Sequence, residues 1–132
     1  MAKITKNFTS IRGDTLKSPK WLITEEIPPQ DITELELLDG IANGTYTPID
    51  LSLYEIKGQV RATPQGTVVI ELPLVVKDNK LSFVIPAETT AAFVNERQTY
   101  GYDIQFKTIS NGEVTTWIAG TISITTDYTY EN

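Results

Sequence analysis

Residues 100–127 read YGYDIQFKTISNGEVTTWIAGTISITTD and carry the clearest β-hairpin pattern in the chain. Apolar and polar side chains alternate on both sides of a Ser-Asn-Gly turn at 110–112, and this period of two is that of half-buried strands. We therefore predict two antiparallel strands over 100–108 and 114–126. The side chains expected to face the core are Tyr100, Tyr102, Ile104, Phe106, Val114, Ile118, Ile122 and Ile124.

The middle of the chain continues this pattern in three consecutive segments. Residues 54–62 alternate, a Thr-Pro-Gln-Gly turn follows, and residues 68–76 and 81–85 alternate on either side of a Lys-Asp-Asn-Lys turn. Pro73 has no N–H for a ladder, so the second segment is expected to be an edge strand or to carry a bulge. Residues 86–95 break the period, and their opening proline and alanines predict a helical turn that connects the sheets.

The first third is less regular. Ile4 and Phe8 predict a first strand, residues 12–15 a turn, and residues 21–27 a second strand that ends at a Pro-Pro pair. Asp31 and Glu34 have the spacing of a capping box, and apolar residues recur every three positions after it, so the segment is either a short helix or a bent strand. Residues 39–48 contain Asp-Gly and Asn-Gly pairs and are expected to form a loop.

About seven short strands with turns every 8–12 residues indicate an all-β antiparallel sandwich with one or two short helical turns. The length of 132 residues fits a single domain over residues 1–132.

Composition removes several classes of function. The chain has no cysteine and no histidine, so disulfides, thiol catalysis and the commonest metal ligand and general base are absent. A net charge of −6 with scattered basic residues argues against nucleic acid as a partner. No apolar run is long enough for a membrane span, and the N-terminal sequence lacks the features of a signal peptide, so we expect synthesis in the cytoplasm. No cofactor, metal ion or catalytic residue is predicted.

Two motifs have both a functional and an ordinary interpretation. Arg12-Gly13-Asp14 matches a cell-attachment tripeptide, but it falls where a turn between strands is expected, and Gly and Asp are common turn residues. The acidic pairs at 25–26 and at 34 and 36 resemble the two carboxylates of a glycosidase, yet solvation alone explains acidic residues at these positions. We favour the ordinary interpretation of both.

Three aromatic residues are candidates for an interface. Trp117 has the parity of the polar face of its strand, where a tryptophan is unusual. Either a bulge or Gly120 shifts the parity and buries it, or it contacts another subunit. Tyr128 and Tyr130 continue the inward parity beyond the expected end of the strand, so the C-terminal segment is a candidate for packing on a neighbour.

Several short motifs follow one another over nearly the whole chain. They are Phe8, Arg12-Gly13-Asp14-Thr15, Thr47-Pro48-Ile49-Asp50-Leu51-Ser52, Tyr54, Gln59-Val60-Arg61, Thr89-Thr90, Tyr100, Tyr102-Asp103-Ile104-Gln105, Gly112, Val114, Thr116, Gly120, Ile122, Ile124 and Asp127. The order of these motifs resembles the immunoglobulin-like domain at the N-terminus of tailed-phage baseplate upper proteins and of related phage structural proteins.

The resemblance implies an immunoglobulin-like β-sandwich that is located in the virion, is synthesised in the host bacterial cytoplasm and has no enzymatic activity. It also implies contacts with other virion structural proteins and with copies of itself, most simply in the tail or baseplate region. A head decoration or cement protein with the same fold is the alternative. A module that binds a glycan or the host surface through the 39–48 loop, with Tyr46, Trp21 or Trp117 stacking on sugar rings, is an alternative of another class.

Overall fold

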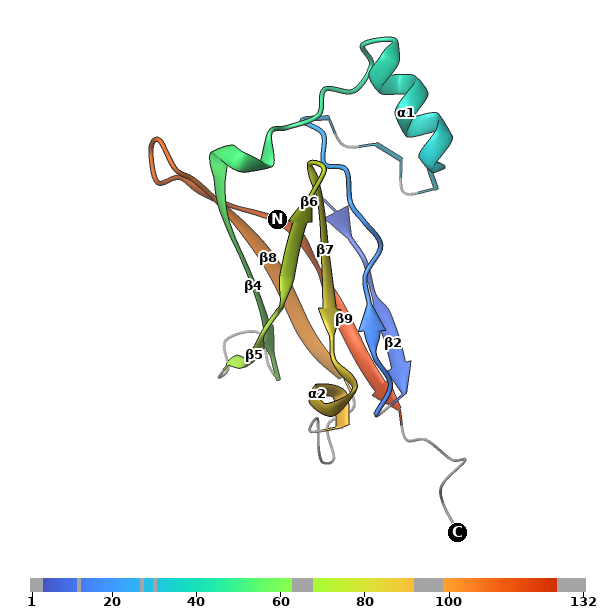
Figure 1. Cartoon of the computed structure of the whole chain (residues 1–132), viewed down its shortest axis with the longest axis vertical. Helices are drawn as coiled ribbons and strands as arrows, with labels where there is room; N and C mark the ends of the chain where they lie inside the picture. The colour runs from blue at the N-terminus through green and yellow to red at the C-terminus, as the bar shows by residue number, and fades with distance from the viewer. Residues whose placement is uncertain are drawn as a thin grey trace.

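Two β-sheets pack face to face in the computed structural model, which confirms the predicted all-β sandwich (Figure 1). The residues that the structure describes are 4–11, 13–26, 28–29, 31–62, 68–91 and 99–125.

The larger sheet has six strands. They are β1 (Ile4–Thr5), β2 (Phe8–Ile11), β4 (Tyr54–Arg61), β5 (Val68–Glu71), β8 (Thr99–Thr108) and β9 (Val114–Thr125). Their order is β1-β9-β8-β4-β5, and β2 also pairs with β9. The smaller sheet has the order β3-β7-β6, and its strands are β3 (Leu16–Lys17), β6 (Leu74–Lys77) and β7 (Lys80–Ile85). Three short helices complete the described chain, namely α1 (Glu34–Ala42), the 3₁₀ helix η1 (Leu51–Leu53) and α2 (Ala87–Ala91).

The predicted hairpin is present as β8 and β9, and its register contains a bulge. Ile104 pairs with Ile118, but Gln105 pairs with Thr116, so β9 has one extra residue, Trp117, at this point. An extra residue inverts the inward parity of β9 on one side of the bulge. Trp117 and Ile118 are consequently both buried, whereas Val114, which we predicted to face the core, is 54% exposed. The prediction for Val114 is therefore wrong.

The N-terminal segment pairs with β9 in parallel, which corrects the expectation of a wholly antiparallel sandwich. Between β1 and β2 the chain stays attached, because Lys6 N–H donates to the Ala119 carbonyl at 3.1 Å and Asn7 Oδ1 accepts from Thr121 N–H at 3.0 Å. The predicted first strand is thus two short strands along one neighbour.

The segment predicted as one strand over 68–76 is two strands in different sheets. Pro73 lies at the crossing, where β5 ends and β6 begins. A residue that cannot donate to a ladder is tolerated at such a break. Both β5 and β6 are outermost strands of their sheets, so the edge location that Pro73 predicted is confirmed and the single strand is wrong. The 77–80 turn is confirmed, with positive φ at Asp78 (53°) and Asn79 (58°).

Residues 21–26 do not form the predicted strand; Ile27 lies outside the described residues. This segment makes only isolated bridges, Trp21 with Leu81 and Thr24 with Pro48. Its backbone also pairs with the 47–49 segment, since Glu25 N–H donates to the Thr47 carbonyl and the Ile23 carbonyl accepts from Ile49 N–H, both at 2.9 Å.

The segment after the Pro-Pro pair, predicted as either a short helix or a bent strand, is a helix, α1. Its boundaries differ from the prediction. Thr33 is the N-cap and Glu36 completes the capping box, rather than Asp31 and Glu34. The helix also continues through the Asp39-Gly40 pair, where we predicted a loop, and ends at Ala42. The helical turn predicted over 86–95 is present as α2 in its described part.

The core lies between the sheets and is rich in aromatic side chains. Phe8 and Tyr102 from the larger sheet meet Phe83 from the smaller one, with ring centroids 5.3–6.0 Å apart. The inward residues predicted for β8, from Tyr100 to Phe106, are all buried. This core fixes the sandwich, whereas α1 lies beyond the end of the two sheets (Figure 1).

Candidate functional site

Trp117 belongs to the core rather than to an exposed surface. It is 6% exposed, and its ring centroid lies 5.7 Å from that of Phe106. The structure therefore agrees with the interpretation that a bulge buries this side chain, and it removes Trp117 as an exposed anchor for another subunit. Tyr128 and Tyr130, the other two interface candidates, lie outside the described residues.

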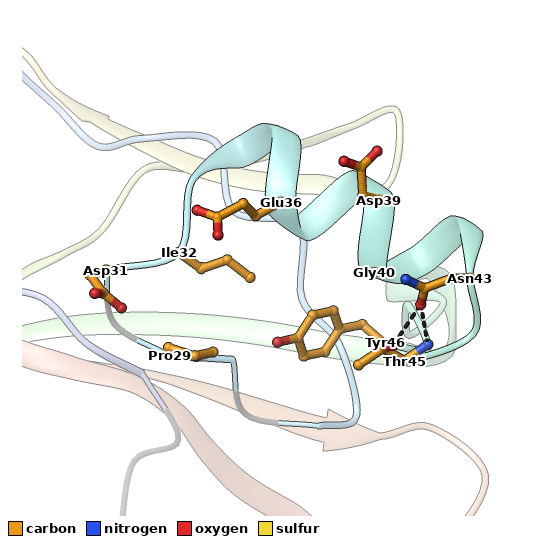
Figure 2. Close-up of a pocket in the computed structure, with 9 residues that line it drawn as sticks. All are labelled: Pro29, Asp31, Ile32, Glu36, Asp39, Gly40, Asn43, Thr45 and Tyr46. Carbon is orange, nitrogen blue, oxygen red and sulfur yellow. Dashed lines mark hydrogen bonds between the residues drawn. The ribbon is translucent and has the colours of Figure 1, made fainter.

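A cavity of about 400 Å³ lies beneath α1, between the helix and the loops that precede and follow it (Figure 2). This volume is within the range of small-molecule sites. The lining residues are Pro29, Asp31, Ile32, Glu36, Asp39, Gly40, Asn43, Thr45 and Tyr46.

Tyr46 attaches α1 to the loop that follows it. Its ring occupies the space that a side chain at Gly40 would need, because a Cβ built on Gly40 would lie 2.3 Å from Tyr46 Cδ2. The Gly40 carbonyl also accepts from Thr45 N–H at 2.8 Å and from Tyr46 N–H at 3.1 Å. A glycine inside a helix costs about 1 kcal/mol relative to alanine, and close packing of Tyr46 is the reason that the helix carries one here.

Several polar groups around the cavity already have partners within the protein. Glu36 Oε1 accepts from Thr33 N–H at 3.1 Å, and Asn43 Oδ1 accepts from both the backbone and the hydroxyl of Thr45. Asp31 and Asp39 are exposed lining residues with no such bond to another described residue. Besides these two carboxylates, the Tyr46 hydroxyl, the Asn43 amide nitrogen and the second carboxylate oxygen of Glu36 make no such bond to another described residue.

A neighbouring carboxylate has a purely structural role. Glu26 Oε1 accepts from Thr47 N–H at 2.6 Å, and this backbone hydrogen bond lowers the pKa of Glu26. Asp50 acts similarly at η1, where the Ser52 hydroxyl and N–H donate to its carboxylate and lower its pKa. These two acidic residues hold backbone in place.

The arrangement at the cavity does not resemble an acid–base pair. Asp31, Glu36 and Asp39 are all exposed, whereas a catalytic acid is usually held in a buried environment. Within the described ranges, no group of three or more acidic side chains is arranged to hold a metal ion. The cavity combines one aromatic side chain with carboxylates, which is a combination suited to a polyhydroxylated ligand.

Of the three aromatic residues predicted to stack on sugars, only Tyr46 lines the cavity. Trp21 is partly buried and packs against Phe8 and Phe83, with centroids 6.3 and 6.0 Å away. The loop predicted over 39–48 contains five of the lining residues, whereas Pro29, Asp31, Ile32 and Glu36 lie outside it and were missed as part of this site. The capping box at Thr33 and Glu36 was the available signal that a helix begins here.

The Gly13-Asp14 part of the attachment tripeptide forms a turn that is fixed to α2; Arg12 is outside the described residues. Thr90 is fully buried, and its hydroxyl accepts from Gly13 N–H at 3.1 Å and lies 2.7 Å from the Asp14 carbonyl, to which it donates. Gly13 has φ +90°, a conformation that favours glycine. The turn interpretation of this motif is confirmed for these two residues.

Two ionisable groups on β8 are perturbed by burial. Tyr102 donates its hydroxyl proton to the Lys6 carbonyl at 2.5 Å, and burial raises its pKa. Burial also raises the pKa of Asp103, although the positive charge of Arg61 partly opposes this change. These groups lie on opposite faces of one strand and do not form a joint site.

A scan against models of known protein families finds no match, and a search of curated proteins finds none with significant similarity. Among the described residues, no helix is long and apolar enough to cross a membrane.

Proposed function

We propose that this chain is a non-enzymatic structural protein of a tailed-bacteriophage virion that acts as an assembly or adaptor module in the tail or baseplate region. The motif order that resembles phage structural proteins supports this assignment, and so does the two-sheet sandwich. In this proposal the protein is synthesised in the host bacterial cytoplasm and contacts other virion proteins and copies of itself.

The observation that carries the proposal is the amount of apolar surface that the chain exposes. Nine large apolar side chains in the described residues are at least 39% exposed. They are Ile11, Leu35, Leu38, Leu53, Val69, Val75, Val76, Ile109 and Val114. Single exposed apolar residues are ordinary, but Leu35 and Leu38 are neighbours on one side of α1. Contiguous apolar surface is what a protein that packs between others would need.

Mass spectrometry of purified virions tests this proposal. The chain should be present in particles banded on a density gradient, in a copy number set by a symmetric position. Its absence from such particles, together with abundant free protein in the lysate, would contradict the proposal.

The cavity beneath α1 favours a second candidate, a module that binds a glycan. Its carrying observation is that Tyr46, Asp31 and Asp39 line the same space, and that neither carboxylate bonds to another described residue. Binding to a glycan array should be lost in Asp31→Asn and kept in Asp78→Asn, a change in the exposed β6–β7 turn. An array without signal for the unmodified protein would reject this candidate.

A further inference from the structure

Helix α1 exposes an apolar stripe that the sandwich does not cover. Leu35 is 69% exposed and Leu38 is 45% exposed, and Ala42 follows at the spacing that continues the same line along the helix. The opposite side of the helix faces Tyr46 through Gly40. Half of the helix thus attaches it to the protein, and the other half has no partner among the described residues.

Acidic side chains border this stripe on both sides. Glu34 precedes Leu38 by one turn and Asp39 follows Leu35 by one turn, so that helical geometry places one carboxylate along each side. The wider sequence strengthens this charge, because residues 21–56 contain eight acidic residues and no lysine or arginine. The net charge of −6 is therefore concentrated around α1.

The outer face of the smaller sheet is basic and partly apolar, which complements the acidic and apolar surface of α1. Strand alternation and the observed pairing place six residues on this face, namely Lys17, Val75, Lys77, Lys80, Ser82 and Val84. Three of them are lysines and none is acidic. Val75 is 48% exposed among them, and Asp78 lies in the β6–β7 turn at the end of this face.

We propose that α1 of one copy docks on the outer face of the β3-β7-β6 sheet of a second copy. The leucine stripe would lie over Val75 and Val84, and the two flanking carboxylates would lie near the lysines. This inference deepens the proposed assembly role and rests on it, since it names the surface through which copies meet.

Charge reversal in two matched variants tests the contact. In the helix variant, Glu34→Lys and Asp39→Lys make α1 basic, so that α1 and the outer face of the smaller sheet are both basic. In the sheet variant, Lys77→Glu and Lys80→Glu make that face acidic, so that it and α1 are both acidic. Each variant alone should associate at least about tenfold more weakly than the unmodified protein in sedimentation velocity. An equimolar mixture should associate again, because each contact in the mixed pair joins opposite charges.

A control and a folding measurement accompany these variants. Lys57→Glu with Lys107→Glu, on the larger sheet, makes the same change in net charge as the sheet variant and should leave association unchanged. Circular dichroism should show that the helix variant keeps its helix. Recovery in the mixture is a result that a merely misfolded variant cannot give.

The unmodified protein should also associate more weakly as salt rises, because charges are screened beyond about 8 Å at physiological ionic strength. A monomer at every concentration, association that survives either reversal, or a mixture that does not recover would each overturn the proposal. Presence in purified virions is a separate result. A strictly monomeric chain found in virions would reject this contact alone, whereas an associating chain absent from virions would reject the proposed function.

Discussion

Gly120→Ala should destabilise the protein through a backbone clash at the β1–β2 junction. A Cβ at position 120 would lie 2.0 Å from the Lys6 carbonyl oxygen, although Cβ contacts below 3.0 Å are essentially never seen. Lys6 would have to move by about 1 Å. Because the obstacle is backbone rather than the end of a flexible side chain, the whole N-terminal segment would move with it.

The expected cost follows from the hydrogen bonds at this junction. Lys6 N–H donates to Ala119, the Lys6 carbonyl accepts from Tyr102, and Asn7 accepts from Thr121 N–H. At about 1 kcal/mol each, their loss would cost about 3 kcal/mol. The lower chain entropy of alanine in the unfolded state offsets about 0.5–1 kcal/mol. We therefore expect a loss of about 2 kcal/mol, which corresponds to a fall in Tm of about 8 °C.

Urea unfolding followed by tryptophan fluorescence measures this change, with Gly101→Ala as the matched control. A Cβ at Gly101 would have no atom within 4 Å, so the same substitution on the neighbouring strand should be neutral or slightly stabilising. A double-mutant cycle with Tyr102→Phe should be non-additive, because both changes act on the Lys6 carbonyl. Equal stability of Gly120→Ala and Gly101→Ala would refute the reasoning.

Three further predictions concern burial and pH. Trp117→Ala should cost about 3–5 kcal/mol in urea unfolding, because the side chain is buried against Phe106; a cost below about 1 kcal/mol would show that it is not in the core. Thr90→Val should cost about 2 kcal/mol, since it leaves the turn at 13–14 without its hydroxyl partner, and a neutral result would contradict those bonds. In a ¹³C NMR titration Asp103 should titrate above its ordinary pKa of 3.8 and Asp50 below it. Asp50 then contributes stability that is present above pH 3.8 and lost as the pH falls through its folded pKa. The contribution of Asp103 has the opposite sign: it is present below pH 3.8 and lost as the pH rises through its folded pKa. The reverse order of titration would contradict both assignments.

Local patterns in the sequence predicted the strands well where side chains alternate without interruption. The segment over 54–62 and the β8 half of the hairpin were correct because burial on one face is a local property of an alternating strand. Val114 was wrong because one extra residue at Trp117 reverses parity, and the position of a bulge depends on the partner strand.

Features that depend on distant partners were not available from local patterns. The parallel pairing of β1 and β2 with β9 joins the two ends of the chain, and no nearby residue encodes it. The passage of the chain from one sheet to the other at Pro73 also depends on distant partners. Pro73 indicated an edge strand, but it did not indicate to which sheet that strand belongs. Tyr46 was identified as a candidate site residue, but the cavity required the helix that continues through Gly40.

A density map of the purified phage particle at side-chain resolution tests the central claim most directly. The account predicts copies of this sandwich at symmetric positions in the tail or baseplate, with the Leu35–Leu38 side of α1 against the outer face of the three-stranded sheet of a neighbouring copy. Complete particles in which every density is assigned to other proteins would contradict it.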